Sequence, residues 1–463
     1  MERVKEILSS LEGRKVLVVG LARSGLAVAK VLAGLGADVT GTDRKESFDE
    51  QDQLEQIGVR LALGGDRVEL VRDSDLIVLS PGVPLTAAIP EAARQERVPI
   101  LGALELASRL IQLNQKLPIL AVTGTNGKST TAALSAHLLE LSGRKVFLGG
   151  NIGRPLADLL LQEDRVDLAV VEVSSFQLEH LSGPEYFVPQ AGIWLNLTPD
   201  HLDRHGSLSA YAAIKRRMFE GQSAHQTGVF FMDDPRLPGQ IDKLACQVKG
   251  FGRKPERLTD GCVLISGNDL ALLGSDLSWR LNSSRLAGDH NAENAAAAIV
   301  ATIAMGISQA SIQAGLDSYA GLPHRLEPVR EIAGVRYIND SKGTNIDATA
   351  KSLTSFSEPV LLLAGGRGKG TNFSKLCPIV SQRVSYLILF GEEAQNLARD
   401  LSGCAEIHMV ASMAEAVERA NDLAGAGEVV LLSPACASFD MFSDYAHRGR
   451  VFTELVQNLE EPK

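Results

Sequence analysis

The stretch GTNGKS, residues 124–129, has the residue types of a phosphate-binding loop. Glycines let successive backbone N–H groups turn toward one ligand, and a helix that begins near Ser129 would add its positive end. In such a loop Lys128 reaches the outer phosphates of a nucleotide, and the Ser129 hydroxyl binds Mg²⁺. Val122 stands where the standard pattern has its first glycine. We therefore predict a nucleotide site at a shortened loop, against the alternative of a glycine turn capped by Ser129.

Possible metal partners follow two later apolar segments. Glu172 stands near the end of the strand predicted over 168–173, and an acid at the carboxyl end of a parallel strand points into the ligand crevice. Mg²⁺ prefers oxygen ligands, so Glu172 is a candidate ligand, the alternative being an exposed carboxylate. The loop NLTPDHLDRHG, residues 196–206, holds two Asp and two His beside the same crevice. His201 is the candidate there, against a structural role.

Lys215 lies on the apolar stripe of a capped helix predicted over 207–221. Tyr211, Met218 and Phe219 stand four before, three after and four after it, so they share its face. A desolvated ammonium loses its proton readily, and the neutral amine can react with carbon dioxide to give a carbamate. The residues alone favour the alternative, a lysine whose stem is buried and whose head reaches water.

The positions of these residues are set by the surrounding strands and helices. Three apolar strands along the chain are each followed by a glycine turn. The three segments are KVLVVGLARSG (15–25), PILAVTGTNGKS (118–129) and PVLLLAGGRGKG (359–370). Continuous apolar strands are typical of parallel sheets covered on both faces, and helical patterns between them complete βαβ units. We predict an α/β fold with parallel sheets and three domains, with bounds 1–106, 107–321 and 322–463.

Composition narrows the class of protein. The chain has 463 residues, of which 45% are hydrophobic and 22% charged, as in soluble globular proteins. The net charge of -10 disfavours non-specific binding to nucleic acid or anionic membranes. Five cysteines without a Cys-x-x-Cys pair indicate a reducing compartment and argue against a disulfide framework and against zinc. No secretory signal opens the chain, and the apolar run over 295–307 is shorter than the ~20 residues of a membrane span. We expect a cytoplasmic protein.

Several motifs resemble, in their order along the chain, those of the Mur ligases of peptidoglycan synthesis in the cell wall. They are TGTNGKST, NIG (151–153), EVSSFQLE, PDHLDRH, the helix with Lys215, GDHNAENAAAA (288–298), GLPHR, INDSKGTN (338–345) and SPACASFDMF (433–442). The last two resemble the family member that adds D-glutamate. The resemblance runs from about Gly20 to Phe452 and implies a Rossmann-like UDP-binding domain, a central P-loop-type ATPase domain and a C-terminal Rossmann-like domain for the amino acid.

The resemblance also implies a reaction. An ATP-dependent amide ligase would add D-glutamate to UDP-N-acetylmuramoyl-L-alanine through an acyl phosphate, releasing ADP and phosphate. Two Mg²⁺ sites are implied, and Lys215 matches a family lysine that becomes carbamylated, which reverses the preference from the residues alone. We expect a monomer without nucleic-acid partners.

Positions within the motifs assign roles to individual residues by similarity. The ATP-binding residues are Gly124, Thr125, Asn126, Gly127, Lys128, Ser129, Thr130, Asn151, Asn291, Asn294, Arg325 and Asp340. The metal ligands are Ser129, Glu172, His201 and carbamylated Lys215, and the catalytic residues are Lys128, Lys215 and His201. The D-glutamate-binding residues are Lys342, Thr344, Lys369, Ser438 and Phe439. The residues that bind the UDP-substrate are Ser24, Asp43, Arg44, Ser80, Gly82 and Asn151.

Two departures and three alternatives stay open. Gly343 stands where alanine is common, and TDRK (42–45) replaces a familiar Asp-x-Arg spacing, so the UDP contacts are the least defined. An NAD-dependent oxidoreductase is one alternative, although GLARSG lacks the middle glycine of its motif. A regulatory nucleotide switch would hydrolyse ATP without an amino acid. A sibling ligase for a diamino acid, a dipeptide or folate-linked glutamate would carry another signature than NDSKGTN with SPACASFD.

Overall fold

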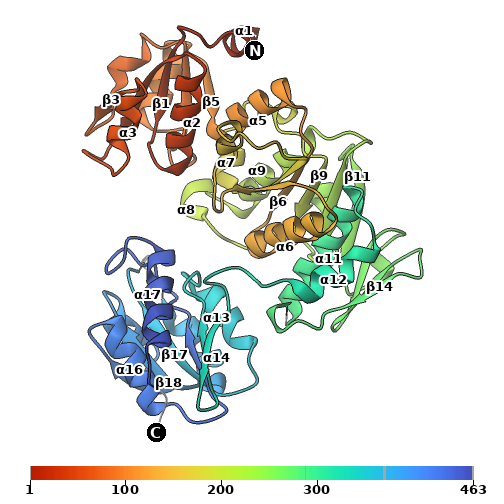
Figure 1. Ribbon diagram of the computed structural model, residues 1–463, viewed down its shortest axis with the longest axis vertical. Helices are drawn as coiled ribbons and strands as arrows, with labels where there is room; N and C mark the ends of the chain where they lie inside the picture. Colours follow the sequence, from red (N-terminus) through yellow and green to blue (C-terminus); the bar gives the residue numbers. More distant parts are fainter. Residues whose placement is uncertain (1, 287, 369–371, 461–463) are drawn as a thin grey trace. The chain divides into compact units, whose positions relative to one another are not determined.

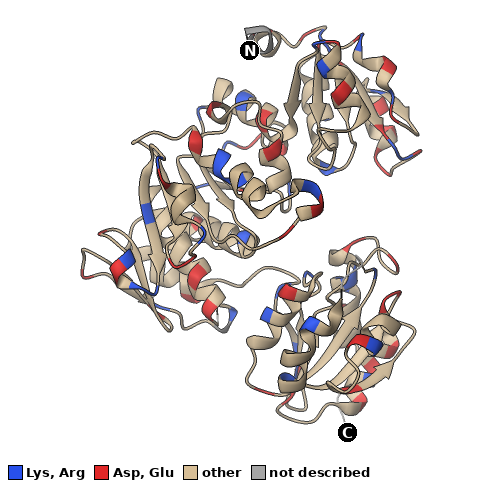
Figure 2. Cartoon of the chain, turned by 180° about the vertical axis from the view of Figure 1, so that it is seen from behind, with Lys and Arg blue, Asp and Glu red and all other residues tan. Residues whose placement is uncertain are grey.

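The computed structural model describes residues 2–286, 288–368 and 372–460, with the side chains of 2–5 and 284 excepted. The chain divides into two compact units (Figure 1). The first unit comprises Met1–Ser283 with Asp289–Tyr319, and the second comprises Ser284–Gly288 with Ala320–Lys463. Acidic and basic residues are interspersed along the helices of both units (Figure 2).

The first sheet has five parallel strands in the order β3-β2-β1-β4-β5. Strand β4 is apolar and fully buried, as is β1 after its first residue, because helices cover both faces of the sheet. The elements are α1 (Glu2–Ser9), β1 (Lys15–Val19), α2 (Arg23–Gly34), β2 (Asp38–Asp43), α3 (Gln51–Gln56), β3 (Arg60–Leu63), η1 (Val68–Val71), β4 (Leu76–Leu79), α4 (Ala88–Gln95) and β5 (Ile100–Gly102).

The second sheet, also in the first unit, has nine strands in the order β14-β13-β12-β11-β10-β9-β6-β8-β7. Strands β6 to β12 pair with one another in parallel, whereas β12 pairs with β13, and β13 with β14, in the antiparallel direction. The elements are α5 (Ala103–Asn114), β6 (Ile119–Thr123), α6 (Lys128–Leu141), β7 (Val146–Gly150), η2 (Leu156–Leu160), β8 (Leu168–Glu172), α7 (Ser175–Glu179), η3 (Pro184–Tyr186), β9 (Ala191–Trp194), α8 (Leu202–His205), α9 (Leu208–Glu220), β10 (Thr227–Phe231), α10 (Pro238–Ile241), β11 (Gln247–Gly252), η4 (Pro255–Arg257), β12 (Val263–Ser266), β13 (Asp269–Leu272), β14 (Ser278–Arg280), α11 (Asp289–Ala304) and α12 (Ala310–Ser318).

Strand β6 lies between β8 and β9, so three parallel strands end at one edge of this sheet. Helix α6 follows β6 directly and packs beside α11 (Figure 1). The predicted capped helix is present as α9, where the Ser207 side chain accepts a hydrogen bond from the Ala210 N–H. The carboxyl ends of β6, β8 and β9 are therefore where this unit brings its polar loops together.

The third sheet forms the second unit and has six strands in the order β15-β16-β20-β17-β18-β19, parallel except for β15 with β16. Helices α13, α14 and α15 cover one face and α16 and α17 the other (Figure 1). The elements are η5 (Ser284–Leu286), β15 (Glu327–Ile332), β16 (Val335–Asn339), α13 (Ile346–Thr354), β17 (Val360–Gly365), η6 (Phe373–Leu376), α14 (Cys377–Arg383), β18 (Val384–Phe390), α15 (Ala394–Asp400), β19 (Glu406–Met409), α16 (Met413–Leu423), β20 (Val429–Leu432) and α17 (Tyr445–Gln457). The predicted α/β class with mostly parallel sheets is confirmed.

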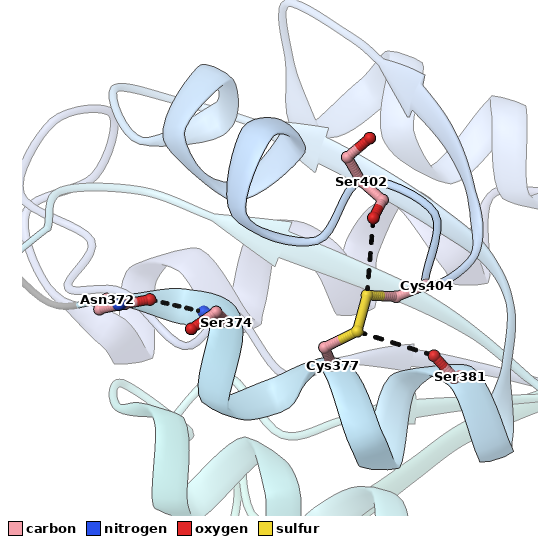
Figure 3. Close-up of a disulfide and its surroundings, with 6 residues drawn as sticks. All are labelled: Asn372, Ser374, Cys377, Ser381, Ser402 and Cys404. Carbon is pink, nitrogen blue, oxygen red and sulfur yellow. Dashed lines mark hydrogen bonds between the residues drawn. A yellow bond between two sulfur atoms is a disulfide. The ribbon is translucent and has the colours of Figure 1, made fainter.

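A disulfide joins Cys377, at the start of α14, to Cys404, in the turn after α15 (Figure 3). The two residues are 27 apart in sequence and meet because α14 and α15 pack on the same face of the third sheet. The other three cysteines are buried free thiols. The cysteine spacing, which argued against a disulfide framework, did not reveal this pair, since sequence spacing does not show which helices share a face.

Within the described residues, no helix has both the length and the apolar character needed to cross a membrane.

Candidate active site

The glycine loop connects β6 to α6. Gly127 caps α6 with a φ of 84°, a left-handed conformation that favours glycine. A Cβ at this position would lie 2.3 Å from Asn294 Oδ1, so space as well as backbone angle disfavours any other residue. Lys128 begins α6, and its ammonium donates to the carbonyl oxygens of Gly124 (3.0 Å) and Thr125 (2.8 Å). A lysine at a helix N-terminus behind a glycine turn is an arrangement that binds phosphate.

Asn196 braces this loop from the end of β9. Its Oδ1 accepts hydrogen bonds from the N–H groups of Thr125 (3.1 Å) and Asn126 (2.9 Å), and its amide donates to the Asn126 carbonyl (3.1 Å). The Thr125 hydroxyl also donates to the carbonyl oxygen of Thr198 (3.1 Å). Sequence reasoning missed Asn196, although its place directly after a strand of the same sheet edge was an available signal.

Glu172 ends β8, the strand next to β6, and is 2% exposed. Its Oε1 accepts a hydrogen bond from Asn151 Nδ2 (2.7 Å), while no described group bonds its Oε2. Ser129, 3% exposed, lies in the first turn of α6. No group of three or more His, Cys, Asp or Glu among the described residues could hold a metal by itself. A buried carboxylate oxygen without a partner still fits Mg²⁺, which binds through one or two carboxylates and keeps water and phosphate ligands.

Lys215 is 1% exposed, so its head does not reach water as the residues alone suggested. Its Nζ donates to the Gly124 carbonyl (2.9 Å) and to Thr123 Oγ1 (3.4 Å), and it lies 4.5 Å from the centre of the Tyr211 ring. Burial lowers the pKa of Lys215 well below its usual value, and the charge of Lys128 lowers it further. Burial beside the glycine loop therefore favours the neutral, nucleophilic form of this amine, while Asp200 and Glu172 oppose the shift.

His201 precedes α8 with a φ of 52°, which is uncommon for a residue other than glycine. Its ring lies 4.8 Å from the Phe176 ring, centre to centre. Burial lowers its pKa, and the charge of Lys128 adds to this while Asp200 opposes it. A neutral imidazole is the form that binds a metal, and left-handed residues of this kind cluster at functional sites.

Two asparagines of α11 lie beside the glycine loop and the first turns of α6. Asn294 Oδ1 accepts a hydrogen bond from Thr131 Oγ1 (3.2 Å), and Asn294 Nδ2 donates to Asn291 Oδ1 (3.3 Å). Both asparagines are buried. The loop, Asn151, Glu172, Lys215, Asn291 and Asn294 are thus gathered in the first unit around the end of β6.

A cavity of about 410 Å³ lies in the same unit, a size that suits a small-molecule ligand. Among its lining residues are Ser24, Asp43, Ser80, Gly82 and Asn151, five of the six predicted for the UDP-substrate.

Arg44 does not line the large cavity. It lines a smaller neighbouring one and pairs with Asp66 (2.9 Å) near the surface. The carboxylate of Asp43 accepts hydrogen bonds from the N–H groups of Leu21 (2.7 Å) and Lys45 (3.0 Å), so it holds the turn after β1.

Residues predicted to bind D-glutamate belong to the second unit. Lys342 donates to the hydroxyl of Tyr445 (3.1 Å), a residue that sequence reasoning missed because no motif marks it. Ser438 is 1% exposed, and its hydroxyl has no hydrogen-bond partner among the described residues. Phe439 is exposed and Thr344 half-buried, whereas Lys369 lies outside the described residues.

Asp340, predicted near ATP, follows β16 in this unit. Its Oδ2 accepts hydrogen bonds from Ser352 (2.6 Å) and Ser433 (2.8 Å). Burial raises the pKa of Asp340 to about 6, although both serines and the charge of Arg325 oppose the rise. Arg325, the other predicted ATP residue of this unit, therefore lies near enough to act on that carboxylate.

Three family models match the chain in succession. The Mur ligase MurD-like N-terminal domain matches residues 14–102, the Mur ligase middle domain residues 122–302, and the Mur ligase glutamate ligase domain residues 324–436. The UDP-N-acetylmuramoylalanine–D-glutamate ligase of Pelotomaculum thermopropionicum is 42% identical over 462 residues, which cover 98% of this chain and 100% of the relative. The chain belongs to the Mur ligase family. The ligase of the same name from Geotalea daltonii is 41% identical over 88% of this chain and 89% of its own.

Solved structures share the fold of this Mur ligase at low identity. The UDP-N-acetylmuramate–alanine ligase of Thermotoga maritima is 22% identical, with a TM-score of 0.62 over 96% of this chain and 99% of that one. The MurF ligase of Thermotoga maritima in complex with ADP is 16% identical, with a TM-score of 0.60 over 98% and 97%. The predicted three-domain α/β architecture is confirmed, whereas the exact domain bounds and the residue roles stay predictions.

Proposed function

We propose that this Mur ligase adds D-glutamate to UDP-N-acetylmuramoyl-L-alanine in an ATP-dependent reaction, as a cytoplasmic monomer. The observation that carries the proposal is the glycine loop before α6, with Lys128, the buried Glu172 and the buried Lys215 gathered at the end of β6. The relatives similar over nearly the whole chain carry this activity in their names. The cavity of about 410 Å³ in the first unit would hold the acceptor.

The proposed reaction has two steps. The acceptor carboxylate attacks the γ-phosphorus of ATP, so a P–O bond forms and ADP leaves. The amine of D-glutamate then adds to the acyl carbon and loses a proton, and the tetrahedral intermediate expels phosphate. Because the first step brings two anions together, the ammonium of Lys128 and the N-terminus of α6 would offset the repulsion.

Mg²⁺ would be held by Ser129 and Glu172 at one site and by His201 at another. When bound, it neutralises charge on the phosphates. The unpartnered Oε2 of Glu172 supports this assignment. Neutral Lys215 would attack carbon dioxide, so that an N–C bond forms, a proton leaves the nitrogen, and the resulting carbamate offers oxygen atoms near the loop.

Residues of the second unit would bind the amino acid. D-glutamate carries two carboxylates, which need cations and hydroxyl donors. Lys342 and the unpartnered hydroxyl of Ser438 are such groups, and Lys369 and Thr344 are predicted to add to them.

The proposal is tested by phosphate release from ATP in the presence of Mg²⁺, the UDP-acceptor and one amino acid at a time, in D and L forms. We expect release with D-glutamate, and none with Lys128→Ala, while Lys145→Ala, at an exposed lysine, behaves as the wild type. Release with a diamino acid instead would indicate a sibling ligase. Release without any amino acid would indicate a nucleotide switch.

A further inference from the structure

Arg204 of α8 contacts two other parts of the first unit, helix α7 and the turn after β4. Its Nε and Nη2 donate to Glu179 Oε2 at the end of α7 (2.9 and 2.6 Å). Its Nη1 donates to the Gly82 carbonyl (3.3 Å) and its Nη2 to the Val83 carbonyl (3.1 Å), both in the turn after β4. The guanidinium lies 4.9 Å from the centre of the Phe176 ring. Only 13% of the side chain is exposed, so this is no ordinary surface ion pair.

The turn that Arg204 binds is part of the acceptor cavity, since Gly82 and Val83 both line it. On its other side the turn is held within the first domain, because Ser80 Oγ donates to the Gly20 carbonyl (2.7 Å). Arg204 therefore anchors this turn as well, and joins it to the loops of the second sheet.

Arg204 is also joined to the predicted metal loop. It follows His201 by three residues, and its N–H donates to the His201 carbonyl (3.1 Å). Next to it, His205 Nε2 and Ser175 Oγ are 3.0 Å apart, which holds α8 against α7. One short segment thus carries both a predicted metal ligand and the arginine that contacts the acceptor cavity.

We propose that Arg204 is a positioning residue that sets where the UDP-acceptor lies relative to His201 and the glycine loop. This inference rests on the proposed function. Arg204 acts through the turn of Gly82 and Val83, because its guanidinium contacts these two residues in the wall of the cavity. The planar guanidinium can bind one carboxylate and two carbonyl oxygens at once, a geometry that the point charge of lysine does not reproduce.

The test compares Arg204→Met, Arg204→Lys and Arg217→Met. Arg217 is the matched control, because it donates to the carbonyls of Leu178 and Glu179 (3.0 Å each) at the same helix end, and no described contact joins it to the turn. In Arg204→Met we expect the KM for the UDP-acceptor to rise at least about tenfold, since hydrogen bonds from a charged donor are each worth such a factor. The KM for ATP should stay within about twofold, as for uncoupled sites.

A second measurement does not depend on turnover. Hydrogen exchange should become faster in the peptide over residues 80–87 of Arg204→Met, and not in the peptide over the glycine loop. Arg204→Lys should show the same changes to a smaller extent, which keeps the test usable if the methionine variant does not fold. Arg217→Met should leave the acceptor KM and the 80–87 peptide unchanged.

The outcomes separate this inference from the proposed function. An inactive wild type would contradict the proposed function, and the exchange measurement with titration of UDP alone would then still test the anchor. An active wild type with an unchanged acceptor KM in Arg204→Met would overturn the inference. Equal rises in KM for acceptor and ATP would overturn it as well, because they would indicate general loosening of the first unit.

Discussion

His180, the residue directly after α7, should make the first unit sensitive to acid. It is 5% exposed and packs against Gly102, where a Cβ would lie 2.5 Å from His180 Cβ. Burial lowers the pKa of His180 to about 4; the charges of Arg204 and Arg217 act in the same direction, and Glu179 opposes them. The imidazole is therefore neutral in the folded protein at every pH at which most proteins are handled.

The sign of the effect follows from proton binding. In the unfolded chain the pKa of this histidine is 6.5, so between pH 6.5 and about 4 only the unfolded state binds the proton. Stability is complete above pH 6.5, falls as the pH drops toward 4 and then levels off. At pH 5 the two pKa values give a loss of about 2 kcal/mol relative to pH 8.

Urea unfolding measured by tryptophan fluorescence suits this prediction, because Trp194 and Trp279 both lie in the first unit. Wild type, His180→Leu and His225→Leu are compared at pH 8 and pH 5, His225 being an exposed control. Carboxylates titrate in all three proteins. The informative quantity is therefore the difference between the proteins in the unfolding free energy that each loses from pH 8 to pH 5. Wild type and His225→Leu should each lose about 2 kcal/mol more than His180→Leu, a midpoint shift of about 1 M urea. Equal losses in all three proteins would refute the argument from burial.

Three further perturbations test other parts of the molecule. Cys377→Ser removes a disulfide with a sequence separation of 27 and should lower the unfolding free energy of the second unit by about 3.5 kcal/mol in the loop-entropy model; unchanged hydrogen-exchange protection of β17 would contradict this. Gly127→Ala should weaken ATP binding about tenfold in calorimetry, because it adds left-handed strain and a contact of 2.3 Å with Asn294 Oδ1, whereas Gly143→Ala has the strain without the contact and should bind normally. Lys215→Ala should lose ligation and regain part of it with a small added carboxylate; failure of every carboxylate to restore activity would argue against the carbamate.

The strands, the glycine loop and the helix face that could be predicted from sequence are determined by residues close to one another along the chain. Continuous apolar runs such as 119–123 and 360–365 indicate buried parallel strands, and they became β6 and β17. The glycines before Lys128 and the apolar residues around Lys215 stand at spacings typical of a phosphate-binding loop and of a helix face. Both features can therefore be recognised without a structure. In these cases local sequence and tertiary packing favour the same conformation.

The parts that could not be predicted depend on residues brought together by packing. The burial of Lys215 follows from its position against Gly124, which lies 91 residues earlier. Arg204 contacts a turn more than a hundred residues away, and nothing in its neighbours distinguishes it from an exposed arginine. Tyr445 reaches Lys342 only because α17 and β16 meet in the second unit. Such contacts have no periodicity from which they could be inferred.

The place of β6 between β8 and β9 has a consequence for synthesis on the ribosome. The strand that carries the glycine loop is made first, and its two flanking partners are complete only at residues 172 and 194. At roughly 5–20 residues per second, both edges of an apolar strand remain open for several seconds of translation. Nascent chains that stall in this interval would expose that strand to other chains, so slow codons there should favour aggregation.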